Sequence, residues 1–157
     1  GRPEADWDLG SLIRNFDQTL HQQATFWSAT PEPPRYDASL NCVFDRKFFL
    51  QLAYRGARLH RSSTHIAVFR IHDACKSYRI KDIFFRENLA VNREMCAKLP
   101  PEEQVHTKRT LDRMEQRRHL HTLSSRADLS DAIRIALQQP SFFTRREFYG
   151  RLRRMMF

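Results

Sequence analysis

The shortage of glycine limits the fold of this chain more than any other feature. Only four of the 157 residues are glycine, and no strand-like alternation of apolar and polar residues continues beyond about five residues. Pro31, Pro33 and Pro34 interrupt the chain early, because proline cannot continue a helix. The sequence therefore predicts an all-α fold of several short-to-medium helices, with an extended, Pro-containing linker over residues 30–35.

Apolar periodicity, caps and prolines divide the chain into predicted helices. They cover, in order, Asp8–Ser28, Leu40–Leu59, a segment after Ser62-Ser63-Thr64 that carries Ile66, Phe69 and Ala74, then Leu89–Lys98, Pro101–Thr122, a segment from Asp128 to Pro140, and a last segment opened by Thr144 and Glu147. The helix before Pro140 has the clearest amphipathic stripe. We expect residues 1–78 to form an N-terminal extension and residues 79–157 a second helical region.

The formal net charge of +9 is unevenly distributed. Residues 1–45 hold three basic and seven acidic side chains, whereas residues 46–157 hold 24 basic and 11 acidic ones. Arginine supplies 22 of the 27 cations, and its guanidinium suits bidentate pairing with carboxylates or phosphates at interfaces. A compositional preference for arginine is the alternative explanation. The asymmetry favours an acidic partner surface facing the second part of the chain.

The three cysteines are odd in number and widely spaced, so they form neither a disulfide framework nor a zinc pattern. Cys42, Cys75 and Cys96 each lie among apolar residues, which favours buried thiols in a reducing compartment. No stretch approaches the ~18–20 apolar residues that span a bilayer. Because the chain begins at Gly1, we expect a processed N-terminus from which any targeting peptide has been removed.

The sequence contains no motif for catalysis. There is no Gly-rich phosphate loop, Gly-x-Ser-x-Gly elbow, His-Glu-x-x-His pair or Cys-x-x-Cys pair. His65 and His72 could share a helix face, but no carboxylate or thiol completes a ligand set. His119 and His121 lie on different helix faces. We therefore predict no catalytic, cofactor-binding or metal-binding residues, and we expect that the protein is not an enzyme.

The predicted helix Pro101–Thr122 is unusually polar. Its few large apolar residues are separated by many cations, so a wide core face cannot hold it. The helix is either solvated, with ion pairs along its surface, or covered by a partner. In the second case we expect Arg113, Arg117 and Arg118 to lie in an interface and to meet carboxylates or lipid phosphates.

The C-terminal segment from Arg145 to Phe157 is basic and amphipathic. Three functions suit such a segment: a membrane-surface helix, a nucleic-acid-binding tail, and a docking helix for an acidic protein surface. The sequence has no signature of a known RNA-binding module. We therefore prefer docking or membrane contact, with Phe148 and Leu152 as interface residues on the apolar face.

One run of residues resembles a known family. It comprises Asp82-Ile83-Phe84-Phe85-Arg86-Glu87-Asn88, then Leu99-Pro100, then Lys108-Arg109-Thr110-Leu111-Asp112. The order and spacing resemble those of the small matrix-side subunit of the mitochondrial cytochrome bc1 complex (complex III), the 14 kDa ubiquinol-binding-protein or subunit 7 family. The stretch between the second and third blocks is about one helical turn shorter than in that family, and a longer N-terminal part precedes the match.

The resemblance implies a non-catalytic structural and assembly subunit of the ubiquinol–cytochrome c reductase, which serves respiratory electron transport. It implies a peripheral position on the matrix side of the mitochondrial inner membrane, with cytochrome b and the core subunits as partners and lipid headgroups as further contacts. The interface or structural positions that it carries over are Asp82, Glu87, Asn88, Leu99, Pro100, Lys108, Arg109 and Asp112. The alternative is a basic mitochondrial ribosomal or other RNA-associated protein, for which nucleic acid would be the partner.

Overall fold

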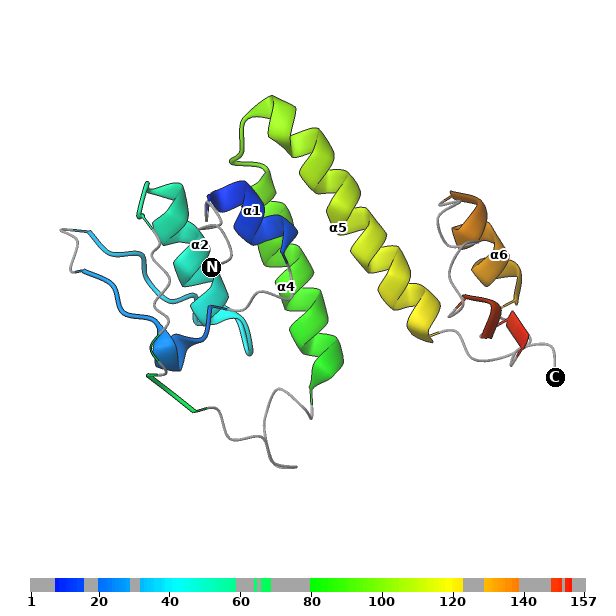
Figure 1. The fold of residues 1–157 in the computed structure, drawn as a ribbon, viewed down its shortest axis with the longest axis horizontal. Coiled ribbons are helices and arrows are strands. Elements are labelled where there is room, and N and C mark those ends of the chain that lie inside the picture. The colour runs from blue at the N-terminus through cyan, green and yellow to red at the C-terminus, as the bar shows by residue number, and fades with distance from the viewer. Residues whose placement is uncertain are drawn as a thin grey trace. The chain divides into compact units, whose positions relative to one another are not determined.

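The structure, a computed structural model, describes residues 8–15, 20–28, 32–58, 64, 66–68, 80–122, 129–138, 148–150 and 152–153. Their helices are α1 (Leu9–Arg14), η1 (Gln22–Ala24, a 3-10 turn), α2 (Phe44–Tyr54), α4 (Lys81–Cys96), α5 (Pro101–Thr122) and α6 (Leu129–Gln138), as Figure 1 shows. No strand occurs in these residues, so the predicted all-α fold is confirmed. None of the described helices is long and apolar enough to cross a membrane.

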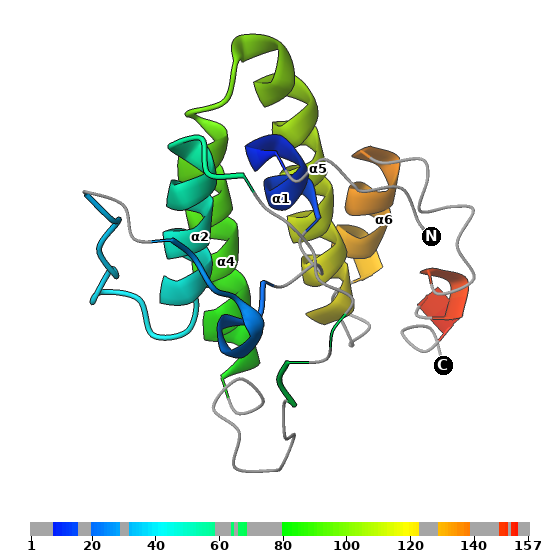
Figure 2. The same cartoon turned by 60° about the vertical axis from the view of Figure 1, so that its left-hand side comes forward.

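The chain forms two compact units that divide within α5. Residues 1–108 make the N-terminal unit and residues 109–157 the C-terminal unit. In the N-terminal unit α1, α2 and α4 lie side by side and contact one another in every pairing, as Figures 1 and 2 show from two directions. Helices α2 and α4 come from the two sides of the predicted boundary at residue 78, yet they pack within one unit.

The core of the N-terminal unit lies between these three helices. Its buried apolar side chains are Leu9, Leu12, Ile13, Val43, Phe48, Phe49, Leu50, Leu52, Leu89, Val91, Met95, Cys96 and Leu99. Helix α1 has six residues, too few to be stable alone. It forms because Leu9, Leu12 and Ile13 are buried and because the Asp8 carboxylate accepts a hydrogen bond from the Ser11 amide at 2.6 Å, which caps its first turn.

Aromatic side chains pack on one side of α2. Tyr36 stacks on Phe48 with 4.8 Å between ring centroids and lies edge-on to Phe44 at 5.7 Å. Trp27 lies against Phe48 and Phe49 with centroid distances of 5.1 and 5.9 Å. These contacts attach the segments before α2 to the helix, and burial of such rings is among the larger apolar contributions to stability.

The predicted helix Asp8–Ser28 is wrong over its second half. Helix α1 ends at Arg14, residues 22–24 form only a 3-10 turn, and residues 25–28 are not helical. Thr25 has an extended backbone, and Trp27 after it packs on α2. Long-range aromatic packing therefore overrides the local helical pattern in this segment.

The predicted helix Leu40–Leu59 is too long at both ends, because α2 begins at Phe44 and ends at Tyr54. Helix α2 ends at a Schellman motif, where the Ala57 amide donates to Leu52 O at 3.1 Å and the Gly56 amide donates to Ala53 O at 3.0 Å. Gly56 has a φ of 84°, which side chains rarely allow, so this glycine sets the end of the helix.

The remaining predictions differ in outcome. Residues 66–68 are not helical, so the predicted third helix is wrong at Ile66, while Phe69 and Ala74 lie outside the described residues. Helix α4 begins at Lys81, well before the predicted Leu89. The bounds of α5 are those predicted, and α6 lies within its predicted segment. Residues 148–150 and 152–153 are helical, and the predicted caps of the last helix lie outside the described residues.

Candidate protein interface

The turn between α4 and α5 is fixed by hydrogen bonds at both sides. The last turn of α4 closes with bonds from Lys98 N to Met95 O and from Leu99 N to Cys96 O, each at 3.1 Å. The Gln104 side-chain amide on α5 donates to Leu99 O at 2.8 Å and to Ala97 O at 3.3 Å. Carbonyls at the end of α4 that lack a helical partner are thereby satisfied, and the direction in which α5 leaves the turn is set.

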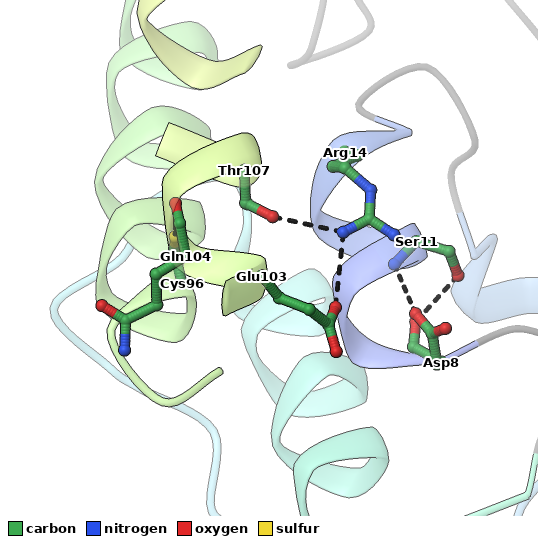
Figure 3. Close-up of polar contacts among 7 residues, drawn as sticks. All are labelled: Asp8, Ser11, Arg14, Cys96, Glu103, Gln104 and Thr107. Atoms are coloured by element: carbon green, nitrogen blue, oxygen red, sulfur yellow. Dashed lines mark hydrogen bonds and ion pairs between the residues drawn. The ribbon is translucent and has the colours of Figure 1, made fainter. Parts of the chain in front are cut away.

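Arg14 ties α1 to the first turns of α5. Its Nη1 donates to the Thr107 hydroxyl at 3.2 Å and to Glu103 Oε2 at 3.5 Å, as the dashed lines in Figure 3 show. Thr107 is fully buried. A Cβ at Gly10 would collide with the Glu103 and Arg14 side chains. Glycine at this position therefore leaves room for the ion pair between the ends of the Arg14 and Glu103 side chains.

Glu87 on α4 binds the backbone that leads into helix α2. Glu87 Oε1 accepts from the Asn41 amide at 2.8 Å and Oε2 accepts from the Cys42 amide at 2.8 Å. Val43, the N-cap residue of α2, supplies no side-chain cap of its own. Burial disfavours the Glu87 carboxylate, but the backbone hydrogen bonds outweigh it and lower its pKa below the usual value. The carboxylate thus fixes the backbone just before α2, and its charge lies near the positive end of the helix dipole.

Arg46 lies buried where α1, α2 and α4 meet. Its Nη2 donates to Leu12 O at 2.9 Å and to Asn92 Oδ1 at 3.1 Å, and Nε donates to the same Asn92 oxygen at 3.3 Å. The Asn92 amide in turn donates to Asn88 Oδ1 at 3.1 Å. Burial lowers the pKa of Arg46 to about 10, and the charge of Asp45 opposes that effect.

Lys47 joins three segments of the N-terminal unit through two carboxylates. Its ammonium lies 2.8 Å from Asp37 Oδ2 and 2.8 Å from Glu94 Oε2. Asp37 also accepts from the Ser39 amide and hydroxyl. The hydrogen bond from Lys47 is the main cause that lowers the pKa of Asp37 to about 2, and hydrogen bonds to Asp37 and Glu94 raise the pKa of Lys47.

The predicted interface residues divide into internal and exposed positions. The internal ones are Glu87, Asn88 and Leu99, which hold helices of the N-terminal unit together. The exposed ones are Asp82, Pro100, Lys108, Arg109, Asp112, Arg113 and Arg117. Arg118 is half-buried. The exposed positions are therefore those that a partner could contact directly.

Phe148 has a different role from the predicted one. Phe148 is buried in a cluster with Ala132, Ile135 and Ala136 of α6, and Leu152 packs against this cluster. The expected apolar docking face of the C-terminal segment thus has an intramolecular partner in the C-terminal unit. These two side chains stabilise the unit, because burying them on α6 removes their apolar surface from water.

The sequence interpretation missed the buried polar residues that join the helices. Arg46 is three residues from both Val43 and Phe49, so its place on the apolar stripe of α2 was readable from spacing. Asn88 and Asn92 are four residues apart and therefore share a face of α4. No sequence pattern indicates that Arg14 pairs with Glu103, or that Lys47 pairs with Asp37 and Glu94.

Within the part of the chain that the structure describes, no three His, Cys, Asp or Glu side chains gather closely enough to hold a metal ion. His65 and His72, which were considered for such a site, lie outside the described residues. No protein-family model, curated protein or solved structure matches this chain.

Proposed function

We propose that this protein is a non-catalytic assembly subunit of the mitochondrial ubiquinol–cytochrome c reductase. In this function it binds peripherally on the matrix side of the inner membrane, packs on cytochrome b and the core subunits, and needs no cofactor of its own. Its contribution to respiratory electron transport is to hold neighbouring subunits in place.

The helix pair α4–α5 carries the proposal. The three sequence blocks behind the family resemblance fall on α4, at the turn after it, and on the middle of α5. Leu99 O accepts from Gln104 and so links the turn after α4 to α5, while Glu87 binds the backbone before α2 and Asn88 accepts from Asn92 within α4. Lys108, Arg109 and Asp112 are exposed on α5. Internal contacts of the residues on and after α4, together with exposed charged residues on α5, favour a function in which α5 is presented to a partner.

The composition of α5 supports a partner-covered helix. Among its described side chains, Thr107 and Leu111 are buried, while cations and carboxylates occupy most of the exposed positions. Interfaces use arginine for bidentate pairing with carboxylates, and the chain supplies arginine in preference to lysine. The excess of positive charge after residue 45 suits an acidic binding surface.

Depletion of the protein in its native cells tests whether it is needed to assemble the reductase and whether it is non-catalytic there. We expect the amount of fully assembled ubiquinol–cytochrome c reductase on native gels to fall. We also expect the turnover of each remaining assembled complex to stay unchanged, because an assembly subunit contributes no reacting group. Loss of mitochondrial translation with intact reductase would instead favour the ribosomal alternative, and normal levels of both assemblies would remove the proposal.

A further inference from the structure

Three arginines form a continuous basic ridge on the exposed side of α5. Arg109, Arg113 and Arg117 are spaced by four residues, so they follow one another along the helix surface with a rise of about 6 Å per step. All three side chains are exposed. We call these three residues the basic ridge. It lies entirely in the C-terminal unit.

The opposite side of the same helix segment faces inward. Leu111 is fully buried, and Met114 and Arg118 are half-buried. Their spacing of three and four residues puts them on one stripe, away from the ridge. Arg118 therefore does not belong with Arg113 and Arg117, although all three were predicted as one group of interface cations.

The ridge places like charges at the spacing where helix side chains are neighbours. They concentrate positive charge along one line of the helix surface, and planar guanidinium groups can pair with carboxylates in bidentate geometry. The ridge is therefore complementary to an acidic surface.

The surroundings of the ridge favour a protein rather than a membrane as that surface. Between Arg109 and His119 no described large apolar side chain is exposed. A helix that lies in a membrane interface buries a broad apolar face in the lipid, which this segment lacks.

The neighbouring charges argue against a nucleic acid. Asp112 is exposed beside Arg109 on the flank of the ridge, where its carboxylate would repel a phosphate backbone. The ridge itself carries no aromatic side chain on which a base could stack. Mixed charges of this kind are normal at protein interfaces, where the two surfaces are locally complementary.

We propose that the basic ridge docks on an acidic face of a partner protein, with Asp or Glu side chains at about four-residue spacing along a helix. The inference rests on the proposed function, because it places the partner protein in the assembly that this chain joins. It adds which residues make the contact and which chemical groups they meet. The partner's carboxylates accept hydrogen bonds from the three guanidinium groups, and Asp112 beside the ridge disfavours a fully anionic surface.

The test compares three tagged full-length variants in native cells. The first reverses the ridge (Arg109→Glu, Arg113→Glu and Arg117→Glu). The second reverses three exposed arginines in the N-terminal unit (Arg35→Glu, Arg58→Glu and Arg86→Glu), which changes the net charge equally. The third keeps the ridge charge (Arg109→Lys, Arg113→Lys and Arg117→Lys). Circular dichroism of the purified chains checks that each variant remains helical.

We expect ridge reversal to lower the complex-bound fraction about tenfold or more, because several ion pairs are replaced by repulsion. The control reversal and the lysine variant should keep most of that fraction. Wild-type binding by the ridge-reversed chain, or equal loss in the two reversed chains, would overturn the inference while leaving the assembly function intact.

A photo-cross-linking residue at position 113 of the otherwise unchanged chain identifies what the ridge touches. The inference predicts cross-links to a peptide rich in Asp and Glu, insensitive to nuclease and to lipid extraction. Cross-links to RNA or lipid would overturn it. If the wild-type chain is found in an assembly other than the reductase, the proposed function fails, and the ridge inference is then decided by the same variants in that assembly. A wild-type chain that is monomeric in its native cells would contradict both the proposed function and the docking of the basic ridge.

Discussion

Arg46 places a positive charge in the interior of the N-terminal unit, between α1, α2 and α4. Its guanidinium is matched by a backbone carbonyl and a side-chain amide, and Asp45 contributes an attractive charge. Oxygen acceptors satisfy the buried donors at lower desolvation cost than an additional buried ion would. Arg46 therefore acts as a polar link between helices that are otherwise joined by apolar packing.

Replacing Arg46 tests this link. Arg46→Ala should lower the free energy of unfolding by about 2–4 kcal/mol, because it leaves the Leu12 carbonyl and the Asn92 amide oxygen buried with fewer donors and opens a cavity. Arg46→Met, which fills most of the volume, should lose less. Urea unfolding followed by circular dichroism measures both, with the exposed Arg35→Ala as a control expected to change stability by less than about 0.5 kcal/mol. Equal stability of Arg46→Ala and the control would show that the link contributes nothing.

Asp37 makes the stability of the N-terminal unit sensitive to acid. The folded state holds the pKa of Asp37 at about 2, below its ordinary value of 3.8, so the unfolded chain takes up the proton first. The stability that its carboxylate contributes is therefore fully present above pH ~4 and is lost as the pH falls toward 2. The lowered pKa of Glu87 acts in the same direction.

Comparing wild type with Asp37→Asn between pH 5 and pH 2 measures this contribution. We expect the wild type to lose more stability than the variant over that interval, by thermal melts followed with circular dichroism. Asp45, whose pKa is raised by burial, has the opposite dependence, but its effect is common to both chains. Parallel pH profiles would mean that the Lys47 ion pair does not stabilise the fold.

At the scale of elements, local signals determined which helix ends could be predicted. Helix α5 begins at Pro101 with Glu102 and Glu103 in its first turn, and these residues marked its start in the sequence. Helix α2 begins after Asn41 and Cys42, whose amides are held by the carboxylate of Glu87 from another helix. No local pattern reveals such a distant contact. The sequence therefore predicts an element end well only when the cap is local.

Gly56 and Gly150 allow the same substitution to be compared in two backbone conformations. Gly56→Ala should lower stability by about 1 kcal/mol, because its φ of 84° is strained for a residue with a Cβ. Gly150 is helical and a Cβ there meets nothing within 4 Å, so Gly150→Ala should raise stability by about 0.5–1 kcal/mol. Thermal melts of the two variants should shift in opposite directions. A shift of the same sign in both would contradict the assigned end of α2.

At the scale of the whole molecule, the sequence predicted the fold class and the polar character of α5, but not how the candidate interface is supported. The all-α fold follows from glycine shortage and helical periodicity, which are local properties. The supports of α5 join residues far apart in the chain, as Arg14 with Glu103 and Thr107 does. Such pairs depend on tertiary packing, so spacing alone cannot identify them. The three ridge residues were among the predicted interface positions, but their separation from the half-buried Arg118 follows only once the buried side of α5 is known.

The most direct measurement of the proposed function is the stoichiometry of this protein in ubiquinol–cytochrome c reductase purified from its native cells. Quantitative mass spectrometry of the complex, isolated through a tag on another subunit, should find this chain equimolar with cytochrome b and retained after nuclease treatment. A chain that is absent from the purified reductase, or that sediments with ribosomes and is released by nuclease, would contradict the proposed function.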